Sequence, residues 1–152
     1  MLAAVESTLC KVEELVNLTV PVTALADFDR LPEAQASTAM KDTPAAFRLS
    51  TGEILINDRT FRLLDGREQR AMIAHETAHA FLKKTGRSLP FGEDVEADIL
   101  ACRWGFTEEL AALRRKDFQA WADCLERLEV DGENATRECL NRLHTLHTAG
   151  IL

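Results

Sequence analysis

Apolar residues recur at helical spacing near the start of the chain, and this pattern predicts a helix over residues 3–17. Residues 18–26 are rich in β-branched side chains and predict a strand, in which Pro21 indicates an edge position or an irregularity near the start. The polar stretch 27–44 contains two prolines, which is typical of a loop with a helical turn.

Two short apolar runs, 46–50 and 53–57, flank the dipeptide Thr51-Gly52 and predict a β-hairpin. Glycine favours such a turn because it adopts positive φ angles without steric cost. A short helical turn is expected at 60–64, before the next long element.

A longer helix follows, and residue types indicate both of its ends. Asp65 and Glu68 have the spacing of a capping box, in which each side chain accepts a hydrogen bond from the other residue's backbone N–H. Gly86 marks the end of the helix, with Lys83 and Lys84 in its last turn, where positive charge is favourable.

The rest of the chain predicts helices. A loop over 88–92 leads to a helix over 93–104, and further helices are expected over 108–130, with a break near 116–117, and over 135–148. An early strand, a hairpin and several helices predict an α+β fold, a small sheet packed against helices.

The length favours a single domain spanning residues 1–152. We expect its core over about 20–106 and a helical C-terminal extension over about 107–152. Hydrophobic residues make up 46% of the chain, which is enough to bury a core of this size.

The balance of charges argues against a nucleic-acid partner. The chain has 18 Lys and Arg residues against 25 Asp and Glu residues, a net charge of −7, whereas nucleic-acid binding needs a basic surface. The basic cluster Arg114-Arg115-Lys116 is more typical of a solvated helix face.

No apolar segment is long enough to span a membrane, and charged residues interrupt the N-terminal region, unlike a secretory signal. Four cysteines lie far apart in the sequence, each within a helical pattern: Cys10, Cys102, Cys124 and Cys139. In a chain of this size we expect them to be reduced, semi-buried thiols. These observations predict a cytoplasmic protein without membrane contacts.

The segment with the most specific chemistry reads His75-Glu76-Thr-Ala-His79, within an uncharged, helix-compatible run. Residues four apart lie one above the other on a helix, so His75 and His79 can bind one metal ion together. Glu76 would lie beside the ion and accept a proton from a bound water. The pattern predicts a zinc-dependent hydrolase, with Mn and Fe as alternative metals.

A hydrolytic zinc site usually has a third protein ligand, expected here among Glu93, Asp94 and Glu96. Residue type favours one of the glutamates. Geometry favours Asp94, which shares a helix face with Asp98 and the small residues Ala101 and Gly105, whereas Glu96 lies about 200° around the helix from Asp94. We therefore favour Asp94, then Glu96, then Glu93. Asp98 is expected to hydrogen-bond a liganding histidine.

This arrangement, His-Glu-Thr-Ala-His followed by a helix that reads Asp94-Val-Glu-Ala-Asp98, resembles the zincin metallopeptidases of the gluzincin type. It is especially similar to ImmA/IrrE-like and HtpX-like domains, in which His-Glu-x-x-His is followed by Glu-x-x-Ala-Asp/Asn. The resemblance covers about 20–106. It implies a minimal zincin-like domain in which strand 53–57 lies beside the helix that carries His75 and His79, called the metal helix below. If that strand lies at the sheet edge, an extended peptide would pair with it.

The resemblance also implies roles for five residues. His75 and His79 would be metal ligands and Glu76 the general base, while the family's ligand glutamate falls on Asp94 and its supporting acid on Asp98. The chain departs from the pattern at Asp94, where Glu is usual.

Peptide hydrolysis also needs a donor for the oxyanion that forms in the transition state. The chain has no tyrosine. We hypothesise that the C-terminal helix folds back and offers His144 or His147 to the site, with Arg103 and Arg48 as further candidates.

Three functions follow from these patterns. The first is a zinc-dependent peptidase that acts on a protein or peptide. The second is a catalytically inactive zincin-like domain that binds or senses a partner. The third is an interaction protein built on the apolar stripe between residues 110 and 128, although such a stripe is more often core. The sequence does not indicate the oligomeric state.

Overall fold

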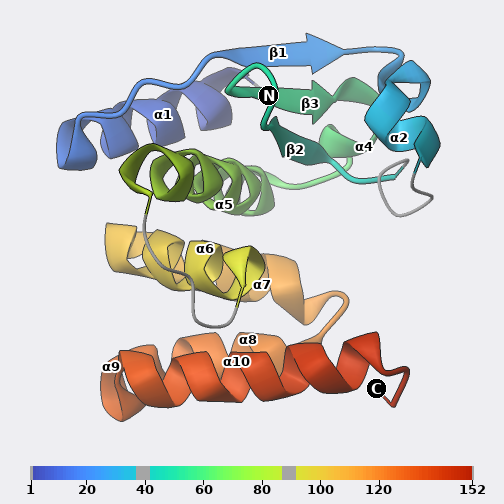
Figure 1. Ribbon diagram of the computed structural model, residues 1–152. Coiled ribbons are helices and arrows are strands. Elements are labelled where there is room, and N and C mark those ends of the chain that lie inside the picture. Colours follow the sequence, from blue (N-terminus) through green and yellow to red (C-terminus); the bar gives the residue numbers. More distant parts are fainter. Residues whose placement is uncertain (1, 37–41, 87–91, 152) are drawn as a thin grey trace.

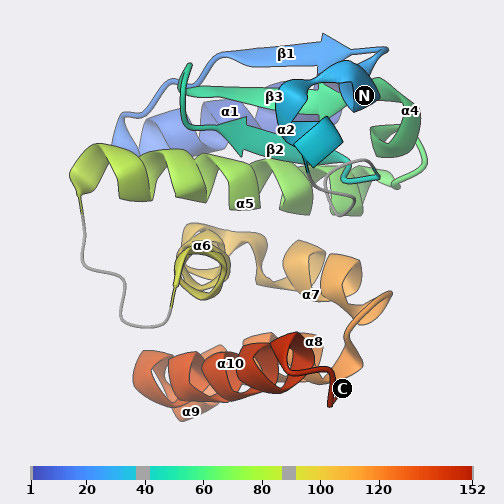
Figure 2. The same ribbon diagram turned by 45° about the vertical axis from the view of Figure 1, so that its right-hand side comes forward.

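The structure of the protein is a computed structural model that describes residues 2–36, 42–86 and 92–151. Its elements form stacked layers (Figure 1, Figure 2). The sheet lies at one end, next to helices α1 (Leu2–Val16) and α5 (Gly66–Thr85), and the later helices form the layers beyond α5. This mostly helical domain with a small mixed sheet confirms the predicted α+β class.

The sheet contains β1 (Val22–Leu25), β2 (Ala45–Arg48) and β3 (Glu53–Asn57) in the order β1-β3-β2. β1 is parallel to β3, and β2 is antiparallel to it as the predicted hairpin requires. β3 is therefore the central strand, and strand 53–57 does not lie at the sheet edge, because β1 pairs along its other side. β2 is an edge strand, on the side of α5 (Figure 1).

The two faces of the sheet pack against different helices, because successive side chains of a strand point to opposite faces. Ile54 and Ile56 of β3 belong to the main core, together with residues of α1 and α5. Leu55 points the other way and packs with Phe28 and Ala34 in a smaller cluster. The short helices around this sheet are η1 (Phe28–Arg30), α2 (Pro32–Ala36) and α4 (Asp58–Phe61).

α5 begins and ends as its sequence predicts. The Asp65 carboxylate accepts a hydrogen bond from the Glu68 N–H at 2.9 Å, and the Glu68 carboxylate accepts one from the Asp65 N–H at 3.2 Å. Gly86 follows the last turn with φ +60°, a left-handed conformation that favours glycine. Most of this helix is buried, so it gives its side chains a rigid support.

Helices follow in the next described segment: α6 (Glu93–Ala101), the π-helical turn η2 (Cys102–Phe106), α7 (Thr107–Arg115), α8 (Gln119–Glu126), α9 (Leu128–Asp131) and α10 (Glu133–Thr148). Gly105, at φ +94°, turns the chain between α6 and α7. The break expected near 116–117 separates α7 from α8. The predicted loop 88–92 lies outside the described residues except for Gly92, as do 37–41 of the predicted loop 27–44.

The apolar stripe between residues 110 and 128 lies in the core. Its buried members are Leu110, Leu113, Trp121, Leu125 and Leu128, and Phe118 packs against them. An interaction protein built on an exposed stripe is therefore contradicted. Within the three described ranges, no helix combines the length and the apolar character that a membrane span needs.

The cysteines differ from the prediction that all four are reduced. Cys124 of α8 and Cys139 of α10 form a disulfide, because these neighbouring helices bring together two residues that are 15 positions apart. Cys10 and Cys102 are free, the first exposed and the second buried. Spacing along the sequence could not indicate this pair, and the argument from reduced thiols to the cytoplasm no longer holds.

Candidate metal centre

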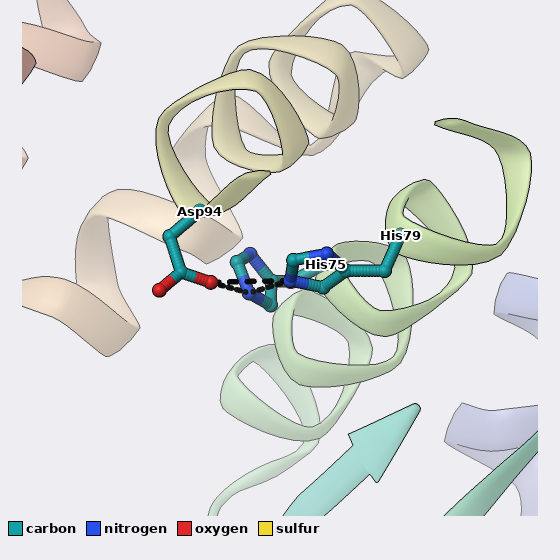
Figure 3. A group of neighbouring side chains, drawn as sticks. All are labelled: His75, His79 and Asp94. Carbon is teal, nitrogen blue, oxygen red and sulfur yellow. Dashed lines mark hydrogen bonds and ion pairs between the residues drawn. The ribbon is translucent and has the colours of Figure 1, made fainter. Parts of the chain in front are cut away.

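Two imidazole rings from α5 meet at one point (Figure 3). The Nε2 atoms of His75 and His79 lie 3.1 Å apart, and the ring planes are inclined by 87°. The spacing of four residues places both rings on one helix face, as the sequence predicts. The side chain of His75 is 7% exposed and that of His79 is 14% exposed, so the pair lies just below the surface.

Asp94, at the start of α6, brings an oxygen to the same point (Figure 3). Its Oδ1 lies 3.1 Å from Nε2 of His79 and 3.5 Å from Nε2 of His75. Ligand atoms about 2.0–2.1 Å from a tetrahedral zinc ion are separated by about 3.3–3.4 Å. The two nitrogens and one oxygen therefore fit a zinc ion with a fourth position free for water.

The other two candidate ligands lie elsewhere. Glu96 pairs with Arg137 of α10, Oε2 to Nε 2.6 Å, because its helix face points away from α5. Glu93 places Oε2 3.9 Å from Nδ1 of His79, on the ring nitrogen opposite the cluster. Ala97 and Ala101 are fully buried, and their small side chains let α6 approach α5 closely.

Behind the cluster, Asp98 is fully buried and binds groups from three helices. Its Oδ1 lies 2.5 Å from Nδ1 of His75, the ring nitrogen that faces away from the cluster. Arg114 of α7 donates to both oxygens, from Nε at 2.9 Å and from Nη2 at 2.8 Å. Trp121 of α8 donates its indole N–H at 2.7 Å. A carboxylate that holds Nδ1–H leaves Nε2 free to bind a metal.

This network sets the charge states of the metal-free site. Burial alone lowers the pKa of His75, but the negative charge of Asp98 and the hydrogen bonds that the His75 ring donates to Asp94 and Asp98 raise it to about 9. Burial raises the pKa of Asp98, and the charges of Arg114 and His75 overcome this and hold it well below its usual range. Hydrogen bonds from His75 and His79 lower the pKa of Asp94.

Sequence reasoning missed Arg114 and Trp121. The prediction that Arg114-Arg115-Lys116 forms a solvated helix face is wrong for Arg114, whose guanidinium lies against Asp98 and 3.1 Å from Nδ1 of His75. In the sequence, Trp121 stands only as an apolar member of the stripe between residues 110 and 128. A buried acid at position 98 needs a compensating cation, which is the one signal that could have directed attention to a nearby arginine.

Glu76 points from α5 toward the sheet. Its Oε2 accepts a hydrogen bond of 2.8 Å from the backbone N–H of Phe47 in β2. The carboxylate predicted as the general base therefore lies at the free edge of the sheet, next to the two histidines. This contact joins α5 to the edge strand β2.

A cavity of about 760 Å³, called the metal cavity below, opens over these residues. One wall is β2, and the opposite wall comes from the later helices, including Phe118, His144 and His147. α10 does fold back, and His147 packs on the Phe118 ring with centroids 5.4 Å apart. Arg103 instead pairs with Glu133, and Arg48 with Glu33.

An α+β domain with His-Glu-x-x-His on its central helix and a carboxylate on the next helix has the organisation of a zincin-type metallopeptidase. The sequence profile of peptidase family M48 matches residues 13–121, and the chain belongs to this family. The match extends past residue 106 and includes Arg114 and Trp121. No curated protein and no solved structure matches the chain at a significant level.

We expect Asp98→Asn to weaken zinc binding by about 10–100-fold, because His75 loses the partner that fixes its ring and its tautomer. Competition with a chromophoric chelator measures this affinity on the folded fraction. Asp131→Asn, on the surface pair with Arg127, is the control and should leave the affinity unchanged. Equal affinities in all three proteins would show that Asp98 does not support the site.

We expect zinc binding to release a proton from His75, since zinc binds the unprotonated ring. The raised pKa stabilises the metal-free fold below about pH 6.5, and this contribution is lost as the pH rises through about 9. The apparent zinc affinity should therefore rise about tenfold per pH unit between pH 7 and 8.5. Calorimetry in buffers of different ionisation enthalpy counts the protons, and a flat affinity would contradict the assignment.

Proposed function

We propose that the protein is a zinc-dependent peptidase in which His75, His79 and Asp94 hold the metal and Glu76 is the general base. The convergence of three ligand atoms beside a carboxylate carries this proposal. The helix that reads Asp94-Val-Glu-Ala-Asp98 resembles that of ImmA/IrrE-like and HtpX-like zincins, with Asp94 where Glu is usual, and this resemblance supports the same roles. Membership of family M48 supports the reaction class.

Each residue has a defined task in the reaction. When bound, zinc makes its water more acidic, with a pKa of about 7, and polarises the scissile carbonyl. Glu76 accepts the proton of the attacking water and passes it to the leaving amine. Asp98 holds the His75 ring in place, and Arg114 and Trp121 hold Asp98.

The substrate is proposed to be an extended peptide that pairs with β2. β2 lies at the edge of the sheet and forms one wall of the cavity. Phe47 of this strand contacts Glu76, so a peptide on β2 would bring its backbone next to the base. A protein that offers an unfolded segment or a terminus would meet this requirement.

The oxyanion donor is proposed to be His147 or His144, which line the cavity wall opposite β2. Both histidines line the same cavity as Glu76 and the three ligand residues, which supports this role, because an oxyanion donor must reach the carbonyl oxygen of a bound substrate.

A second candidate function is a non-catalytic zincin-like domain that binds a partner at the same cavity. The observation that favours it is the engagement of Glu76 by the Phe47 N–H, since a base in a peptidase must be able to reach a water. Both candidates require the metal cluster, and they differ in whether Glu76 supports turnover.

We expect Glu76→Gln to abolish cleavage of a denatured protein substrate while zinc content stays near one ion per chain. Glutamine keeps the acceptor for the Phe47 N–H but cannot take a proton. Peptide release and metal analysis measure the two properties. His75→Ala should lose both. Cleavage that persists in the glutamine variant would refute the role of Glu76, and an inactive wild type that still binds zinc would favour the second candidate.

Replacing both His144 and His147 by alanine should lower kcat by about 10²–10³-fold, the effect of removing an oxyanion donor. Zinc affinity and KM should change little, because the three ligands stay in place. The single variants identify the donor. Unchanged turnover in the double variant would overturn the assignment of a donor to α10.

A further inference from the structure

A second cavity, of about 330 Å³, lies next to the metal cavity. Its apolar lining includes Phe28, Leu31 and Leu55. Both cavities share Ala46, Phe47 and Leu49, so β2 and the turn after it lie between them. None of the proposed catalytic or metal-binding residues lines the second cavity.

The pleat of the sheet assigns each cavity to one face of β2. Ala46 pairs with Leu55 of β3, and residues opposite each other in a sheet point to the same face. Leu55 lies in the smaller cluster, with Phe28, on the face away from α5. Ala45 pairs with Ile56 and points into the main core, toward α5.

The hydrogen-bond register shows which backbone groups of β2 point outward. The Pro44 carbonyl accepts a hydrogen bond from the Asn57 N–H of β3 at 2.8 Å, and the Arg48 carbonyl accepts one from the N–H of Gly52, just before β3, at 2.8 Å. In an antiparallel pair such residues alternate with ones whose backbone groups point away from the partner strand. Ala45 and Phe47 are therefore the outward-facing residues, consistent with the bond from Phe47 to Glu76.

We infer that the second cavity is a subsite that binds an apolar side chain of the peptide substrate, one residue along the chain from the side chain that faces the metal cluster. This inference rests on the proposed peptidase function. A peptide paired with the outward edge of β2 sends its side chains alternately to the two faces. The residue opposite Phe47 lies on the α5 face, and its neighbours lie on the face of the second cavity.

The lining favours an uncharged, apolar side chain. Phe28 is 1% exposed and Leu55 3% exposed, so the floor of the cavity is fixed by the smaller core cluster. Among the described residues, the charged ones at this cavity are Arg48 and Glu33, which pair with each other at 3.1 Å. A charged substrate side chain would have to leave water and compete with this pair, whereas an aliphatic or aromatic one loses only contact with water.

Leu49 lines both cavities. Its side chain is 59% exposed although it belongs to both cavities, and its carbonyl accepts a hydrogen bond of 2.5 Å from Lys83 of α5. The main chain at this position is therefore held by the metal helix. An exposed leucine beside a substrate strand gains burial when an apolar side chain binds.

Mapping of cleavage sites tests the inference. Zinc-loaded wild-type chain is incubated with denatured β-casein, new termini are identified by mass spectrometry, and sites that also appear with Glu76→Gln are subtracted. We expect aliphatic or aromatic residues at one fixed position within two residues of the cut. Two synthetic peptides that differ only there, leucine against asparagine, should differ at least about tenfold in kcat/KM.

Filling the cavity should remove this preference. Ala46→Leu places extra methyl groups in the cavity and should lower kcat/KM for the leucine peptide about tenfold, with little change for the asparagine peptide. Ala24→Leu, on the other edge strand, is the matched control and should behave as wild type. Leu49 is exposed, so Leu49→Ser should leave the fold intact. It should weaken the same preference by raising KM for the leucine peptide.

The outcomes separate the subsite from the reaction. The subsite is overturned if Glu76-dependent cleavage shows no positional preference, or if Ala46→Leu leaves the preference intact. Either result is still consistent with the proposed peptidase. If the wild type cleaves nothing, the peptidase proposal fails. Binding of the two fluorescently labelled peptides to zinc-loaded Glu76→Gln then tests the subsite. The subsite is supported if the leucine peptide binds more tightly and Ala46→Leu removes this difference. Equal binding of the two peptides overturns it.

Discussion

The buried charge of Asp98 is the constraint on which the rest of the site depends. A carboxylate removed from water is costly unless its oxygens are hydrogen-bonded and its charge is compensated. Here the partners come from α5, α7 and α8, through His75, Arg114 and Trp121. The same bonds that satisfy Asp98 fix the ring of His75 and dock the later helices on the metal helix. The acid is therefore both a structural anchor and a support of the metal site.

The second organising contact is between the metal helix and the edge strand. Glu76 binds the Phe47 N–H, and Lys83, about two turns further along α5, binds the Leu49 carbonyl. These two bonds align β2 beside the cavity, with its outward backbone groups next to the base. In the proposed peptidase, this arrangement would place an extended substrate beside Glu76.

The helices after residue 106 are part of the site. The sequence predicts a boundary at about residue 107 between the core and a C-terminal extension. Arg114 and Trp121 lie beyond this boundary, yet both contact Asp98 next to the metal ligands. α10 adds the wall that carries His144 and His147, and the disulfide to α8 and the Arg137–Glu96 pair hold it in place. The C-terminal extension thus closes the metal cavity on the side opposite the sheet.

Local sequence determined the features that depend on neighbours along the chain. The spacing of His75 and His79, the capping box at Asp65 and the turn at Gly52 all follow from short-range geometry, as does the preference for Asp94 over Glu96 on one helix face. Tertiary structure decided the rest. The central position of β3, the pairing of Arg114 with Asp98 and the Cys124–Cys139 bond join segments far apart in sequence, and only packing of the whole chain sets which distant partners meet.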